Sequence, residues 1–86
     1  MGNYKVELTA SAERQLKHLP KIELKRVVTA LEMLAITPFP QGCRKLSGIA
    51  NTFRVRVGNY RIIYEVLVET VVVKVLKIGH RKDVYR

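Results

Sequence analysis

Residues 52–64 read Thr-Phe-Arg-Val-Arg-Val-Gly-Asn-Tyr-Arg-Ile-Ile-Tyr, two alternating runs on either side of Gly58-Asn59. A glycine-led pair between such runs is typical of a β-hairpin with a two-residue turn. This turn fixes the register, so we expect Arg56 opposite Arg61. Successive side chains point to opposite faces of a sheet. The stretch therefore predicts an apolar face made by Val55, Val57, Tyr60, Ile62 and Tyr64, and a second face that carries Arg54, Arg56 and Arg61.

The arginine face of this hairpin is unusual because like charges that face each other across a ladder destabilise it. The stretch contains no carboxylate that could compensate them. Planar guanidinium groups match the oxygens of phosphate well. The pattern therefore indicates an anion-binding surface, with an ordinary solvated strand face as the alternative.

The length and charge of the chain narrow the class of protein. Its 86 residues are enough for one domain, spanning 1–86. The net charge is +9, and residues 44–86 hold ten Lys and Arg against three carboxylates. Such a charge, concentrated in the half that contains the hairpin, favours nucleic acid or an acidic protein as partner.

Other features of the sequence exclude several classes. No apolar run approaches the roughly 18 residues of a membrane span, and the N-terminus lacks the apolar stretch of a signal peptide. We therefore expect a cytoplasmic protein without a membrane partner. Cys43 has no second cysteine to pair with, and the ligand spacing of a metal site is absent. No metal and no other cofactor is expected.

The rest of the chain predicts an α+β domain. Residues 3–8 alternate as a strand, and Thr9 or Ser11 can cap a short helix that reaches about His18. Pro20 suits the first turn of a second, amphipathic helix that ends at Thr37-Pro38. A Val-rich strand at about 70–78 follows the hairpin. We expect an N-terminal strand, a two-helix hairpin and a three-stranded antiparallel meander, which together make a four-stranded sheet with both helices on one face.

Three segments resemble those of one known family. They are Lys45-Leu46-Ser47-Gly48, residues 54–64, and Gly79-His80-Arg81-Lys82-Asp83-Val84-Tyr85. In this order they resemble the RelE/ParE toxin superfamily, most closely its RelE branch. The resemblance implies the toxin of a type II toxin–antitoxin system, a metal-independent endoribonuclease that cleaves messenger RNA in the ribosomal A site and inhibits translation. It also implies a hetero-oligomer with an antitoxin, which we expect to be small and acidic.

The resemblance also implies roles for individual residues. The candidate catalytic set is Arg54, Arg56, Arg61, His80, Arg81 and Tyr85, and the candidate RNA-binding set is Lys45, Arg54, Arg56, Arg61, Lys77 and Lys82. Arginines can neutralise charge at phosphorus but hold their protons at neutral pH. Proton transfer is therefore expected from His80 and Tyr85, with the assignment of base and acid left open.

Two other functions remain alternatives at this stage. A ParE-like chain poisons DNA gyrase instead of cutting RNA, but such chains tend to lack the full basic and aromatic set. A non-catalytic nucleic-acid-binding partner of an antitoxin would need no proton transfer at all. The presence of the whole set, including Arg81 and Tyr85, favours the nuclease.

Overall fold

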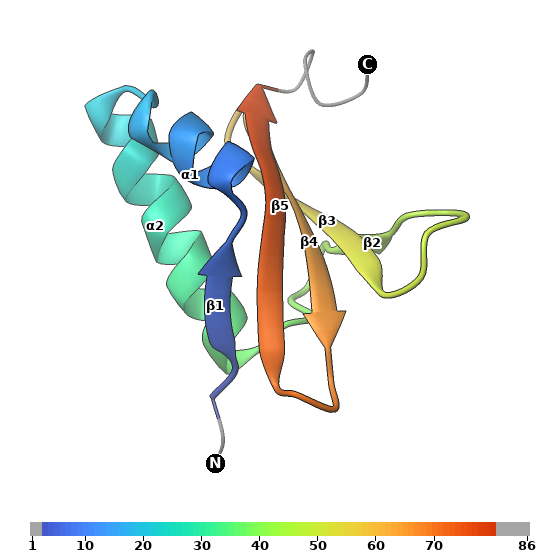
Figure 1. Cartoon of the computed structure of the whole chain (residues 1–86). Helices are drawn as coiled ribbons and strands as arrows, with labels where there is room; N and C mark the ends of the chain where they lie inside the picture. Colours follow the sequence, from blue (N-terminus) through green and yellow to red (C-terminus); the bar gives the residue numbers. More distant parts are fainter. Residues whose placement is uncertain (1–2, 81–86) are drawn as a thin grey trace.

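The computed structural model describes residues 3–80 and shows two helices packed on one five-stranded sheet (Figure 1). The elements in chain order are β1 (Lys5–Leu8), α1 (Ala10–Lys17), α2 (Lys21–Ile36), β2 (Arg44–Lys45), β3 (Thr52–Val57), β4 (Tyr60–Leu67) and β5 (Val72–His80). The strand order is β1-β5-β4-β3-β2. The β1–β5 pair is parallel and all other pairs are antiparallel. The α+β class predicted from the sequence is confirmed.

The expected number of strands was wrong, because β2 adds a fifth strand beside β3. This strand has only two residues, and Arg44 pairs with Arg54 while Lys45 pairs with Phe53. The amide of Leu46 also donates to the carbonyl of Thr52 at 2.9 Å. Two residues are too few to show the alternation by which a strand is recognised in a sequence. The sequence of this segment therefore does not distinguish a strand from a loop.

Helix α1 begins at a threonine cap and also covers the edge of β5. The Thr9 hydroxyl accepts from the amide of Ala12 at 3.0 Å, as an N-cap does, and donates to the carbonyl of Leu76 at 3.1 Å. Farther along α1, the side-chain oxygen of Gln15 accepts from the amide of Ile78 at 2.7 Å. Strand β1 pairs with β5 only as far as Val75. Side chains of α1 and its cap thus bind backbone groups of β5 beyond the end of β1.

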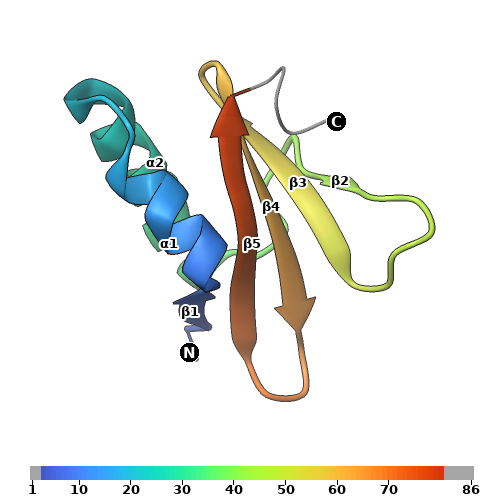
Figure 2. The same cartoon turned by 45° about the horizontal axis from the view of Figure 1, so that its top comes forward.

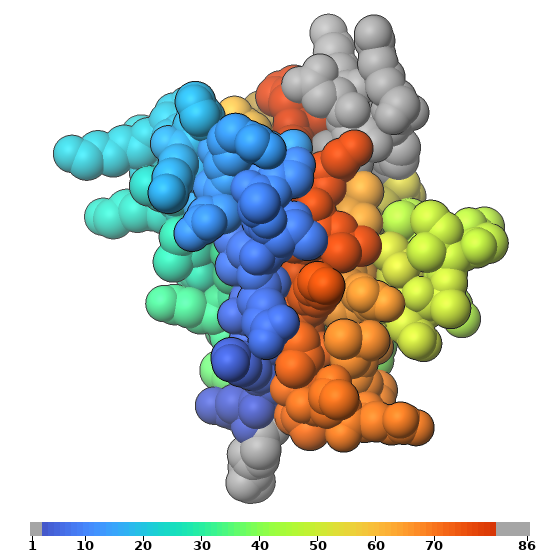
Figure 3. Space-filling model, in the orientation of Figure 1, coloured from blue at the N-terminus to red at the C-terminus, as the bar shows by residue number. Residues whose placement is uncertain are grey.

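The core lies between the helices and one face of the sheet. Figures 1 and 2 show both helices on the same side of the sheet. The buried residues are Ala12, Val27, Leu31, Leu34, Ile62, Tyr64, Val66, Val73, Val75 and Ile78. In Figure 3 the surfaces of β5, β4 and the β2–β3 region lie side by side without a helix over them. Within residues 3–80, no helix covers the other face of the sheet, as the sequence predicted.

The central hairpin has the predicted register. Val57 lies opposite Tyr60, Arg56 opposite Arg61 and Arg54 opposite Ile63. Gly58 has a positive φ of 61° and Asn59 is not among the residues with positive φ. This combination is that of a type II′ turn, which requires glycine first and matches the twist of paired strands.

The loop between β4 and β5 contains a strained residue, Val71, whose φ is 58°. For a residue with a Cβ, the left-handed region costs about 1–2 kcal/mol, and β-branched residues are rare there. Val71 is 40% exposed, so its side chain contributes little to the core. We expect Val71→Asn to raise the free energy of unfolding by about 1 kcal/mol, because asparagine tolerates this conformation. Urea denaturation measures this change.

Val68→Asn is the matched control, since Val68 lies in the same loop and is 60% exposed but has no positive φ. It should bring no gain. Equal stabilisation by both substitutions would show that loop polarity, and not backbone strain, is the cause.

Candidate functional site

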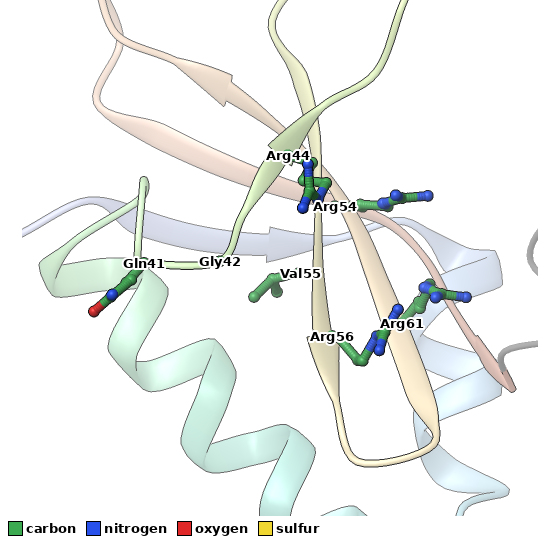
Figure 4. Close-up of a pocket in the computed structure, with 7 residues that line it drawn as sticks. All are labelled: Gln41, Gly42, Arg44, Arg54, Val55, Arg56 and Arg61. Atoms are coloured by element: carbon green, nitrogen blue, oxygen red, sulfur yellow. The ribbon is translucent and has the colours of Figure 1, made fainter.

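Four arginines from three strands line one pocket on the helix-free side of the sheet. The pocket has a volume of about 320 Å³ and is lined by Gln41, Gly42, Arg44, Arg54, Val55, Arg56 and Arg61. In Figure 4, Arg44 and Arg54 lie at one end and Arg56 and Arg61 at the other, near the hairpin turn. Val55 between them points toward α2. The sequence prediction that the hairpin arginines share one face is thus confirmed.

The strand register explains why these side chains meet. Arg44 pairs with Arg54 across β2 and β3, and Arg56 pairs with Arg61 across β3 and β4. Directly paired residues project from the same face, about 5 Å apart. Arg54 and Arg56 are two residues apart on β3, which separates the two pairs by roughly 7 Å along the strand. The result is two neighbouring pairs of arginines on one face of the sheet.

The loop before β2 keeps the pocket open at its edge. Gly42 has a φ of 93°, in the left-handed region that favours glycine. Strand β2 begins only at Arg44, so the edge of β3 beyond Arg54 has no β2 residue paired with it. Gln41 and Gly42 of this loop line the pocket together with the strand residues.

The electrostatics of the pocket favour an anion. None of its described lining residues carries a carboxylate. Arg44 and Arg56 are exposed and Arg54 is half-buried, whereas Arg61 is only 4% exposed. Charges interact more strongly where water is excluded than at an exposed surface. A phosphate that enters the pocket would therefore contact the exposed Arg44 and Arg56 more readily than the buried Arg61.

Sequence reasoning selected Lys45 and missed its neighbour Arg44. Because Arg44 pairs with Arg54 and Lys45 pairs with Phe53, the two basic residues point to opposite faces. Lys45 lines a separate surface hollow with residues 46–50. If residues 44–45 had been known to pair with β3, the register would have placed Arg44 on the arginine face. No local pattern in the sequence marks residues 44 and 45 as a strand.

The structure places His80 away from the arginines. His80 pairs with Tyr60, which in turn pairs with Val57, and Val57 packs against the core on the helix side. The rings of Tyr60 and His80 meet edge to face, with centroids 5.5 Å apart. Together with residues at the start of α2, they line a different pocket. His80 is therefore not brought together with the arginine pocket.

The remaining predicted residues fall in two groups. Lys77 pairs with Ile63, which pairs with Arg54, so Lys77 projects from the arginine side of the sheet two strands away. It does not line the pocket. Arg81, Lys82 and Tyr85 lie outside the described residues.

Tyr64 lies in the core of the domain, and its environment makes it a structural residue. It is fully buried, and its hydroxyl donates to the carbonyl of Pro38 at 2.9 Å. Its ring stacks on Phe53, which contacts Phe39 in the loop before β2. Burial raises the pKa of the Tyr64 phenol above its ordinary value, and nearby Cys43 adds to this. The phenol therefore stays protonated, and its hydrogen bond to Pro38 holds the loop that leads to β2 in place.

We expect Tyr64→Phe to lower the free energy of unfolding by about 1–3 kcal/mol at pH 7, because a buried carbonyl loses its donor. The folded protein keeps the Tyr64 proton above pH 10, whereas the unfolded chain releases it near the ordinary tyrosine pKa of about 10. Stability of the native protein should therefore fall above about pH 10, by up to about 1.4 kcal/mol per pH unit from this group. Urea denaturation between pH 7 and 11 should show that the difference in the free energy of unfolding between the native protein and Tyr64→Phe becomes smaller as the pH rises. A constant gap would contradict the assigned pKa shift.

Two further features of the described residues concern metal sites and membrane spans. Within residues 3–80, no group of three or more His, Cys, Asp or Glu side chains is placed to hold a metal ion. No helix in the described part of the chain is long and apolar enough to cross a membrane.

Comparison with known proteins identifies the family of this chain. A family model described as the ParE toxin of type II toxin–antitoxin system, parDE, matches residues 6–85. The toxin RelG of Mycobacterium tuberculosis is 37% identical over 84 residues, covering 96% of this chain and 97% of that protein.

Solved structures agree with this relationship. A chain of the archaeal RelE–RelB complex from Pyrococcus horikoshii OT3 is 30% identical with a TM-score of 0.83, covering 94% of this chain and 98% of its own length. A chain of the RelBE2 toxin–antitoxin complex from M. tuberculosis is 33% identical with a TM-score of 0.81, covering 92% and 99%. The chain therefore belongs to the RelE/ParE superfamily of type II toxin–antitoxin toxins, as a RelE-like member.

Proposed function

We propose that this toxin is a ribosome-dependent endoribonuclease that cleaves messenger RNA in the A site and thereby inhibits translation. One observation carries the proposal: four arginines of three strands line a single pocket without a carboxylate among its described lining residues. Convergent guanidinium groups bind phosphate oxygens through paired hydrogen bonds. They also stabilise the extra negative charge that develops at phosphorus during phosphodiester cleavage.

In the proposed reaction the 2′-oxygen of the RNA bonds to the adjacent phosphorus while the bond from phosphorus to the 5′-oxygen breaks. A 2′,3′-cyclic phosphate and a free 5′-hydroxyl result. A general base takes the proton of the 2′-hydroxyl, and a general acid gives a proton to the leaving 5′-oxygen. Arg54, Arg56 and Arg61 neutralise the negative charge on the oxygens bound to phosphorus. The resemblance to the family assigns the same role to Arg81. Because His80 lies on the other face of the sheet, we assign proton transfer first to Tyr85.

The test is in vitro translation with mapping of messenger RNA ends. We expect cuts within codons positioned in the A site, with a 2′,3′-cyclic phosphate on the upstream fragment. RNA that stays intact while the toxin arrests translation would overturn the nuclease proposal. If free RNA is cut at the same rate as ribosome-bound RNA, the proposed dependence on the ribosome is wrong.

We also propose an acidic antitoxin as the partner that controls this activity. The two solved relatives described above come from RelE–RelB and RelBE2 complexes. A net charge of +9 and an arginine pocket on a helix-free sheet face support an acidic segment as the binding element. Addition of the protein encoded beside this toxin should abolish cleavage, and the inhibition should weaken at high salt.

Inhibition of DNA gyrase is the second candidate, because the matching family model is described as a ParE toxin. It predicts gyrase-dependent DNA breaks in the presence of intact RNA. The arginine pocket favours the nuclease, since poisoning of gyrase requires no cluster that neutralises a scissile phosphate. Parallel assays with gyrase and with programmed ribosomes separate the two functions.

A further inference from the structure

We propose that Gln15 of α1 is a positioning residue for Arg61, on which it acts through the end of strand β5. The side-chain oxygen of Gln15 accepts a hydrogen bond from the amide of Ile78 at 2.7 Å. Gly79, the next residue of the strand, lies opposite Arg61 in the sheet. Gln15 is not among the described residues that line the arginine pocket, and it touches no substrate. The inference rests on the proposed nuclease function and adds to it a residue from the helix side of the sheet.

The end of β5 needs support because its neighbour β1 is too short. Strand β1 pairs with β5 from Lys5, opposite Val72, to Leu8, opposite Val75. Strand β5 continues as far as His80, and β4 pairs with it there on its other side. A strand edge without a neighbouring strand presents backbone N–H and C=O groups that need other partners. On this edge α1 and its cap supply such partners.

Two residues of the α1 region bind successive parts of this edge. The amide and the hydroxyl of Thr9 donate to the carbonyls of Val75 and Leu76, at 3.0 and 3.1 Å. Gln15 acts farther along the strand, where it accepts from the amide of Ile78. Burial of the Ile78 side chain, which is 1% exposed, fixes the face that this residue presents to the core. The hydrogen bond to Gln15 adds a directional restraint on the backbone itself.

This restraint matters because the next residue is a glycine. Gly79 has more backbone freedom than a residue with a Cβ, and a glycine weakens the strand that contains it. Only the backbone of Gly79 faces Arg61 across the pair, at a Cα separation of about 5 Å. A displaced Gly79 therefore changes the position of Arg61, which is 4% exposed and lines the pocket. Catalysis is sensitive to such shifts, since a misplacement of about 1 Å can lower a rate about 10²-fold.

The first experiment separates the rate of cleavage from binding. In Gln15→Met the side chain keeps a similar length and helix propensity but loses the oxygen that accepts from Ile78. We expect the single-turnover rate on programmed ribosomes to fall about tenfold at saturating toxin. The toxin concentration that gives half the maximal rate should change by less than about twofold, because the exposed arginines of the pocket remain. Gln15→Glu keeps an acceptor at this position and should restore the rate to within about threefold of the native value.

Leu16→Ala is the matched control for a simple loss of stability. Leu16 is the next residue of α1 and packs against the core. Its truncation should lower the melting temperature at least as much as Gln15→Met does. Measured well below both melting temperatures, the single-turnover rate of Leu16→Ala should stay within about twofold of the native rate. Equal losses of rate in Leu16→Ala and Gln15→Met, or a Gln15→Glu protein as slow as Gln15→Met, would overturn the inference.

Amide hydrogen exchange followed by NMR tests the same restraint without any cleavage. We expect the Ile78 amide to exchange at least about tenfold faster in Gln15→Met than in the native protein. The amide of Val73, in the part of β5 that pairs with β1, should change by less than about twofold. The NMR signal of the Arg61 guanidinium should shift in Gln15→Met. Unchanged exchange at Ile78, or an unchanged Arg61 signal, would contradict the proposed restraint.

Together these measurements keep the inference apart from the proposed function. Normal cleavage by Gln15→Met would remove Gln15 as a positioning residue and leave the nuclease. If the native protein cleaves no RNA but Gln15→Met alters both the exchange at Ile78 and the Arg61 signal, the restraint on Arg61 is supported and the nuclease is overturned.

Discussion

Arg56→Ala is expected to reduce the single-turnover rate of messenger RNA cleavage by about 10²–10³-fold, the usual effect of removing one group that stabilises transition-state charge. Arg56 pairs with Arg61 and is exposed, so its guanidinium can contact the scissile phosphate. It is a better test than Arg61, which is 4% exposed and whose loss would disturb a buried region. The measurement is the rate of fragment appearance with toxin in excess over programmed ribosomes.

Three controls make this result specific. Arg14→Ala removes an exposed arginine from α1 and should leave the rate within twofold of the native value. Arg56→Lys keeps the charge but loses the planar paired donors, so its rate should fall between those of native protein and Arg56→Ala. The melting temperature of Arg56→Ala should stay equal or rise slightly, because a like-charge pair disappears. Faster cleavage by Arg56→Ala would contradict its assigned role.

Tyr85→Phe is expected to slow single-turnover cleavage by about 10²-fold or more while RNA binding stays nearly intact, because general acid–base catalysis contributes about 10²–10⁴-fold. The substitution removes only the phenolic oxygen, so the aromatic ring remains. Tyr85 lies outside the described residues, and its assignment rests on the family motif together with the position of His80. An unchanged rate would remove Tyr85 from the mechanism.

His80→Gln completes this comparison. The His80 ring contacts Tyr60 on the helix side of the sheet, opposite to the arginines. We therefore expect a loss of less than threefold in the cleavage rate. A loss equal to that of Tyr85→Phe would show that His80 reaches the scissile phosphate when RNA is bound. If cleavage slows in His80→Gln but not in Tyr85→Phe, proton transfer belongs to His80 and not to Tyr85.

The hairpin was predictable because its information is local. Gly58-Asn59 sets the turn, the turn sets the register, and alternation then places Arg54, Arg56 and Arg61 on one face. The Thr9 cap and the end of α2 before Pro38 follow from equally local rules. Each of these features depends on residues that are close in sequence.

The bulge in β5 was not predictable, and it changes the faces of two candidate residues. The register of the β4–β5 pair shifts between Ile63 and Tyr64. Tyr64 pairs with Val75 and Ile63 pairs with Lys77, so Leu76 has no partner in β4. Strict alternation from Val73 and Val75 would turn Lys77 toward the core. The extra residue, Leu76, instead lets Ile78 be buried and turns His80 to the helix side. The hydroxyl of Thr9, 67 positions away, binds the carbonyl of Leu76.

The sequence by itself determined the α+β class, the arginine hairpin with its register, the high positive charge and the family of the toxin. Tertiary structure alone decided that β2 exists, that Arg44 instead of Lys45 joins the arginine pocket, and that His80 faces away from it. The physical reason is the range of the interactions involved. Turns, caps and alternation act between neighbours, whereas the pairing of a two-residue edge strand and the phase of a bulged strand depend on hydrogen bonds and burial supplied by distant segments.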